Sequence, residues 1–81
     1  MRIDKYLKIS RLIKRRTVAA EACSAGRVAI NGKAAKAGTE VKIGDVITIG
    51  FGTREIKVEV LGISEHVTKD GASALYKVIE G

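Results

Sequence analysis

The periodicity of the apolar residues changes at Arg27, and this change constrains the fold more than any other feature of the sequence. Before Arg27 the apolar residues recur at helical spacing, and after it they alternate as they do in β-strands. The alternating part begins with RVAI, Asn31-Gly32 and KAAK, and an Asn-Gly pair favours the type I′ turn of a two-residue hairpin. We therefore expect an α+β fold, in which two N-terminal basic helices pack on a small, mostly antiparallel β-sheet.

Two helices are expected before the hairpin. Residues 2–15 place most apolar side chains on one side and most cations on the other when successive residues are turned by about 100°. Leu12 falls among the cations, which indicates that this helix ends or bends near residues 10–12. Thr17 is the expected N-cap of a second helix, Val18–Ala25, whose alanines allow close packing.

The second helix and the later strands have recognisable ends. Gly26 is expected to end the helix in the left-handed conformation, which glycine adopts without steric cost. After the hairpin, alternating or β-branched segments predict strands at residues 46–51, 54–63 and 75–79. The segment TKDGASA before the last strand is expected to be a turn, with one short helical turn as an alternative.

Positive charge is concentrated in the first half of the chain. The net charge is +6, and residues 1–36 carry ten Lys and Arg against two acids, whereas residues 37–81 carry five against seven. One such residue is ordinarily a solvated surface charge, but ordinary surfaces mix the two signs. The asymmetry indicates a polyanionic partner that contacts one side of the molecule. The candidate phosphate-binding residues are Arg2, Lys5, Lys8, Arg11, Lys14, Arg15, Arg16, Arg27, Lys33 and Lys36.

The sequence offers no constellation of residues for catalysis, metal binding or a cofactor. One Cys and one His cannot provide a structural zinc site, and the glycines form no phosphate-binding loop, so we expect that the protein is not an enzyme. Cys23, Tyr6 and Tyr76 are expected to pack in the core, and His66 to lie in a surface loop. No apolar run approaches the ~20 residues of a bilayer span, and a lone cysteine fits a reducing compartment, so a cytoplasmic location is expected.

Three segments occur in a specific order and spacing: RIDKYL, SRLIKRRTVAAEACSAGRVAINGKAAKAG and VKIGDVI. In this order they resemble the S4 RNA-binding domain, a module named after a protein of the small ribosomal subunit. The matching elements are Arg2 to Leu7, Thr17 to Ala25, Gly26, Val28 to Gly32, and Gly44 to Val46. The resemblance covers residues 1–50, approximately, so a single S4-type domain is expected over residues 1–81, with residues 51–81 closing the sheet.

Among the short stand-alone members, the chain is similar to the RqcP (YabO-like) family of bacterial ribosome-associated quality control, relatives of the heat-shock S4 protein. This resemblance implies binding to large ribosomal subunits blocked by peptidyl-tRNA. The residues that it implies in contact with rRNA or tRNA phosphates are Arg2, Lys5, Lys8, Arg11, Lys14, Arg15 and Arg16, with Lys33 and Lys36 flanking them. Arg16 is the first candidate, followed by Arg2 and Arg15. It also implies a nascent-chain tailing factor as a protein partner. We expect a monomer without a membrane partner. The heat-shock relative carries a longer basic C-terminal extension, which we do not expect in this protein.

Other partners remain open on sequence alone. Within RNA binding, the target can be free tRNA, mRNA or a ribosome-assembly intermediate. Duplex DNA is a further polyanion that charge cannot distinguish, and an adaptor for another protein would carry the cations only for solubility. Binding to an anionic membrane is less consistent, because the apolar face of the first helix is needed to cover a small core.

Overall fold

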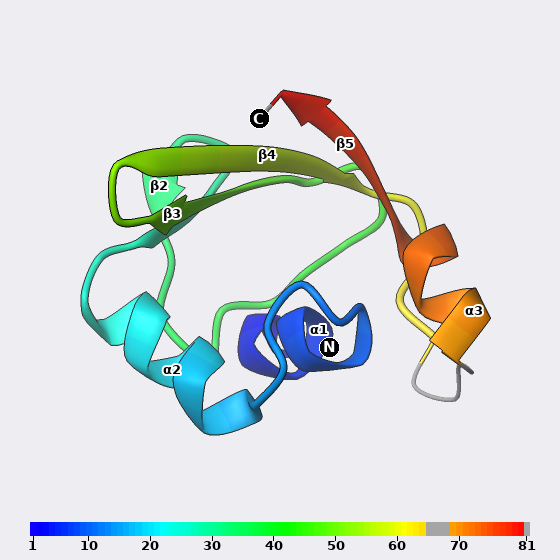
Figure 1. The fold of residues 1–81 in the computed structure, drawn as a ribbon, viewed down its shortest axis with the longest axis horizontal. Helices are drawn as coiled ribbons and strands as arrows, with labels where there is room; N and C mark the ends of the chain where they lie inside the picture. Colours follow the sequence, from blue (N-terminus) through cyan, green and yellow to red (C-terminus); the bar gives the residue numbers. More distant parts are fainter. Residues whose placement is uncertain (65–68, 81) are drawn as a thin grey trace.

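Two helices cover one face of a five-stranded antiparallel sheet in the computed structural model of the chain, which describes residues 1–64 and 69–80 (Figure 1). The strand order is β2-β1-β3-β4-β5, and every neighbouring pair is antiparallel. The predicted α+β fold, with two N-terminal helices on an antiparallel sheet, is confirmed. The elements are α1 (Ile3–Ile9), α2 (Arg16–Ser24), β1 (Val28–Ile30), β2 (Lys33–Ala34), β3 (Val46–Phe51), β4 (Arg54–Val60), α3 (Lys69–Ala72), the 3₁₀ helix η1 (Ser73–Leu75) and β5 (Tyr76–Glu80).

Helix α1 is shorter than the predicted helix at residues 2–15, and it ends where Leu12 indicated an interruption. The last helical residue is Ile9, and Arg11 takes a φ of 62°, in the left-handed region. This reversal brings Leu12 back against the core, where it is half-buried, instead of leaving it among the exposed cations. The expected end of the helix near residues 10–12 is confirmed.

Helix α2 begins earlier than predicted, at Arg16, so Thr17 is not its N-cap. Arg15 is the N-cap, in an extended conformation, and its carbonyl accepts the first helical hydrogen bond, from the Ala19 N–H at 3.0 Å. Thr17 therefore lies inside the first turn. At the other end Gly26 has a φ of 75°, and the N–H of Arg27 donates to a carbonyl in the last turn of the helix, as in a Schellman motif. The left-handed Gly26 is confirmed.

The Asn31-Gly32 hairpin has the predicted turn type. Both residues have positive φ, 51° and 83°, as a type I′ turn requires. The Asn31 side chain also joins this turn to the turn before β3, because its amide donates to Asp45 at 3.0 Å and its oxygen accepts the Val46 N–H at 3.0 Å. These bonds hold β1 and β3 together in antiparallel register.

The core lies between α1 and the inner face of the sheet. Tyr6 is fully buried there, and its hydroxyl donates to the Leu75 carbonyl at 2.7 Å, which ties α1 to the segment before β5. Burial raises the pKa of the Tyr6 hydroxyl above its ordinary value, with a smaller contribution from Tyr76. Tyr76 and Cys23 also pack with the core, as predicted. Sheet residues in the same core include Ile47, Ile49, Val58 and Val60.

The C-terminal segments follow the predicted order with shifted ends. The predicted strand at 54–63 ends earlier, at Val60, and the last strand starts one residue later than predicted, at Tyr76. The predicted turn between them contains α3 and η1. His66 lies outside the described residues, so its predicted surface position stays a prediction. None of the helices in the described chain combines the length and apolar character that crossing a membrane requires.

Candidate nucleic-acid interface

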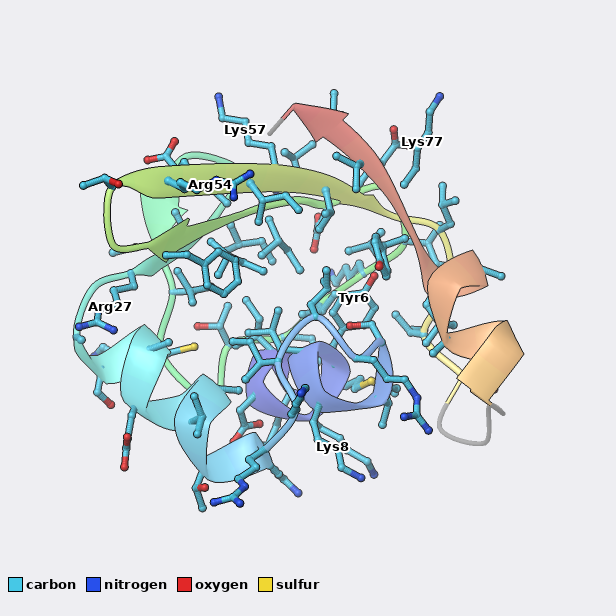
Figure 2. The ribbon with its side chains drawn as sticks, viewed as in Figure 1. Tyr6, Lys8, Arg27, Arg54, Lys57 and Lys77 are labelled. Atoms are coloured by element: carbon cyan, nitrogen blue, oxygen red, sulfur yellow. The ribbon has the colours of Figure 1, made fainter. Side chains whose placement is uncertain are left out.

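Nine of the ten predicted phosphate-binding residues are exposed, and Lys5 is half-buried. Figure 2 shows Lys8 pointing away from the sheet on the helical side and Arg27 beside the end of α2, whereas Lys57 and Lys77 lie across the sheet on its outer face. We call the surface formed by α1, the connection at residues 10–15 and α2 the helical face. Most of the predicted cations belong to this face.

A buried carboxylate connects two of the three first-ranked residues. Asp4, in the first turn of α1, is 3% exposed, and its two oxygens lie 3.4 Å from the Nε atoms of Arg2 and Arg16. The Arg2 and Arg16 side chains are 55% and 48% exposed. Each guanidinium has five N–H donors, so the pairing with Asp4 leaves donors that face solvent. The carboxylate therefore fixes the direction of two arginines without covering them.

This role of Asp4 was not predicted from the sequence. The available signal was its isolation, because Asp4 is the only acid before Glu21 in a chain segment rich in arginine. The Asp4 oxygen also accepts the Lys5 N–H at 2.7 Å. Cys23 lies close enough that its thiol pKa is raised, first by burial and then by the Asp4 charge.

The N-terminus of α1 is closed to an anion by the chain itself. The N–H of Ile3 donates to the Thr39 carbonyl at 2.8 Å, and the N–H of Asp4 donates to the Ala37 carbonyl. This packing brings the loop that contains Lys36 to the start of α1. Lys33 instead lies on β2 at the edge of the sheet. The structure thus places Lys36 near the helical face and Lys33 at the edge of the sheet.

Three other predicted cations line a pocket that was not predicted from the sequence. Lys14, Arg15 and Arg27 line a cavity of about 450 Å³ between the connection to α2, α2 itself and the end of β3. Its apolar lining includes Val18 and Phe51. The sequence signal was the single phenylalanine, between two glycines at the end of a strand. Within residues 1–64 and 69–80, no cluster of His, Cys, Asp or Glu is arranged to hold a metal ion.

Comparisons with known proteins agree with this arrangement. The S4 domain model matches residues 1–47. The chain is 55% identical over 78 residues to the RQC P-site tRNA stabilizing factor of Halalkalibacterium halodurans, covering 96% of this chain and 89% of that protein. It is 49% identical over 80 residues to the protein of the same name in Listeria monocytogenes, covering 99% of this chain and 87% of that protein.

A solved structure extends the likeness to three dimensions. The structure of Vibrio cholerae Heat Shock Protein 15, which is trimeric, superposes with a TM-score of 0.88 at 33% identity. The match covers 96% of this chain and 80% of that chain. Nearly the whole fold is therefore shared, including both helices and the sheet. On its sequence and its structure together, the chain belongs to the S4 domain family and, within it, to the family of the RQC P-site tRNA stabilizing factors.

Proposed function

We propose that this protein binds structured RNA of the large ribosomal subunit through its helical face and stabilises the P-site tRNA there during ribosome-associated quality control. The observation that carries the proposal is the pair Arg2 and Arg16, both held by the buried Asp4 with their remaining donors exposed. The names of the relatives at about half identity support the same reading.

The arginine pair is suited to phosphate because its geometry is set before binding. A guanidinium can bind two phosphate oxygens at once, and such charge-assisted hydrogen bonds are stronger than neutral ones. Free arginine side chains lose rotamer freedom when they bind, and the Asp4 contacts remove part of that loss in advance. Lys8, Arg11 and Arg15 are exposed on the same face and extend the contact along a phosphate backbone.

This mode of action needs no covalent chemistry. The protein acts as a binder in the cytoplasm, and its contribution is the free energy with which it holds tRNA and rRNA together on the large subunit. A nascent-chain tailing factor is the protein partner that this role calls for. The protein is proposed to act as a monomer, although one structural relative is trimeric.

The test is binding to purified large subunits that retain peptidyl-tRNA, measured by co-sedimentation. The double variant Arg2→Ala with Arg16→Ala is expected to bind at least about tenfold more weakly, because two charge-assisted contacts are lost. The matched control is Lys57→Ala with Lys77→Ala, two cations on the outer face of the sheet (Figure 2), which should bind as the wild type does. Equal binding by both double variants would contradict the proposal.

Two further measurements separate this target from other RNAs. Log affinity should fall linearly with log salt concentration, because several phosphates are neutralised together. The protein should also slow the release of peptidyl-tRNA from large subunits, and the Arg2 and Arg16 double variant should not. Binding of free tRNA as tightly as of the subunit complex, without any effect on peptidyl-tRNA release, would favour a free-tRNA binder instead.

A further inference from the structure

The pocket beside α2 has a composition that phosphate binding alone does not explain. Its volume is about 450 Å³, within the range of pockets that hold small molecules or parts of larger ligands. Phosphates bind to exposed cations on an open surface and need no apolar cavity. The apolar walls of this pocket therefore call for a ligand with a flat or apolar part in addition to its charge.

The walls of the pocket come from α2 on one side and from β3 on the other. Val18 and Ala22 belong to α2, and Ile49 and Phe51 belong to β3. Phe51 is 49% exposed and Val18 is 46% exposed, although both are apolar. Neither belongs to the buried core cluster, so the fold does not need their exposed surfaces.

The charged side chains that line the pocket are positive. Lys14 and Arg15 precede α2, and Arg27 follows it, so cations lie at both ends of the wall that α2 forms. Among the residues that the structure describes, no acidic one lines the cavity. This pattern is complementary to an apolar group that is flanked by negative charges along a chain. A nucleotide within RNA has this chemistry, because a flat base is attached to a backbone with a phosphate on either side.

We propose that this pocket takes an unpaired nucleobase of the bound RNA, stacked against Phe51, with its flanking phosphates on Arg15 and Arg27. The proposal rests on the proposed RNA binding and adds to it a contact that depends on an unpaired base. Unpaired bases are the common target of specific RNA recognition because they can leave the helix and stack on aromatic side chains. The Phe51 ring supplies that stacking surface at the exposed end of β3.

The test compares two RNA hairpins that differ in one base. Each has the same stem and one unpaired nucleotide, which carries adenine in the first hairpin and is an abasic ribose in the second. Wild-type protein should bind the adenine hairpin at least about fivefold more tightly than the abasic hairpin, because a base stacked on an aromatic residue usually contributes about 1 kcal/mol or more. Fluorescence anisotropy measures both affinities. Phe51→Ala should bind the two hairpins equally, at the wild-type affinity for the abasic hairpin.

Matched variants distinguish stacking from other effects. Phe51→Trp should retain the preference for the base, because it keeps an aromatic surface. Ile43→Ala, which trims an apolar residue that is 65% exposed and lies outside the pocket, should leave both affinities unchanged. With 2-aminopurine in place of the adenine, wild-type protein should change the fluorescence of the base and Phe51→Ala should not. Melting curves check that each variant remains folded.

Each contrary outcome has a clear meaning. Equal wild-type affinity for the two hairpins would overturn the proposal. An equal loss of affinity for both hairpins in Phe51→Ala would also overturn it, because the ring would then contact the backbone or support the fold. Preference for the base that survives Phe51→Ala would place the base elsewhere and leave the pocket to an apolar protein segment. Failure of the proposed ribosomal role would instead appear as unchanged binding of the Arg2→Ala with Arg16→Ala variant to large subunits. That result is independent of the comparison between the adenine and abasic hairpins.

Discussion

The helical face and the outer face of the sheet carry charge in opposite ways. On the helical face the exposed charged residues are cations apart from Glu21, and the second acid, Asp4, is buried beneath two arginines. On the outer face the signs are mixed, and Glu59 lies opposite Lys77 across β4 and β5. Figure 2 shows Lys57 and Lys77 on that outer side, with Lys8 on the other side of the molecule. The excess positive charge of this protein is therefore concentrated on one face and is not spread evenly over its surface.

The largest effect is expected from reversing charge on one face at a time. Lys8→Glu with Arg15→Glu should weaken RNA binding roughly a hundredfold, because charge-assisted contacts contribute about 1.5 kcal/mol or more each and 1.4 kcal/mol is a factor of ten. Lys57→Glu with Lys77→Glu makes the same change in net charge on the outer face of the sheet. That control should weaken binding by less than about threefold, through long-range repulsion alone. Similar losses in the two variants, measured by anisotropy at one salt concentration, would show that only net charge matters.

The next largest effect is expected on stability, in the sheet. Gly32→Val should lower the free energy of unfolding by about 2 kcal/mol, because valine strongly resists the φ of 83° at this turn position. A β-carbon at Gly32 would meet no atom within 4 Å, so the cost comes from the backbone and not from a clash. Urea denaturation measures this cost. The folded Gly32→Val variant should bind RNA as tightly as the wild type does.

Gly38→Val is the matched control for this turn. A β-carbon at Gly38 would likewise meet no atom within 4 Å, and the φ of Gly38 is not in the left-handed region. The control should therefore change the unfolding free energy by less than about 0.5 kcal/mol, as surface substitutions usually do. Equal stability of the two variants would mean that the turn at Asn31-Gly32 is not held in the type I′ form.

Much of the fold could be predicted from local patterns. The Asn-Gly turn, the left-handed Gly26 and the interruption at Leu12 each depend on a few neighbouring residues, and all three were confirmed. The ends of α2 and β4 depend on tertiary contacts and were misplaced. Thr17 was the better capping residue by propensity, but the chain enters α2 at Arg15, and this start places the Arg16 side chain against Asp4.

The candidate site was only partly predictable. The sign of the charges and the helical spacing of the apolar residues were enough to identify exposed cations, because exposure follows from the amphipathic pattern of a helix. The contact between Asp4 and Arg16 joins residues on different helices, and no spacing rule within one helix could reveal it. The pocket similarly needs β3 and α2 to face each other, which places Phe51 and Val18 on opposite walls of one cavity. Such sites arise from packing, so they appear only once the elements are placed.

A smaller effect is expected from removing the charge beneath the arginines. Asp4→Asn keeps the size of the side chain and an oxygen for the Lys5 N–H, but it no longer attracts Arg2 and Arg16. RNA affinity should fall about three- to tenfold, because the two guanidiniums lose their fixed direction and must be ordered on binding. The free energy of unfolding should fall by about 1 kcal/mol, because a carboxylate in the first turn stabilises α1.

A double-mutant cycle shows whether Asp4 acts through the arginines. In the background Arg2→Ala with Arg16→Ala, the further change Asp4→Asn should cause no additional loss of RNA affinity. The same further loss in both backgrounds would mean that Asp4 affects binding in another way, such as through the position of α1. Thermal melting of all the variants separates that case from simple unfolding.

The smallest effect is expected at the contact that joins the two regions, and it depends on pH. Tyr6→Phe removes the hydroxyl that donates to the Leu75 carbonyl, which also accepts the N–H groups of Leu61 and Gly62. Because the carbonyl keeps two donors, the loss near neutral pH should be only about 1 kcal/mol. Since the pKa of Tyr6 is raised in the folded protein, its contribution is complete below the ordinary tyrosine value of 10.0 and declines as the pH rises above it. Urea denaturation on either side of that value should therefore show the gap between wild type and Tyr6→Phe narrowing in alkali. A constant gap would mean that the hydroxyl is solvated in the fold, and that α1 and the C-terminal segment are held together by apolar packing alone.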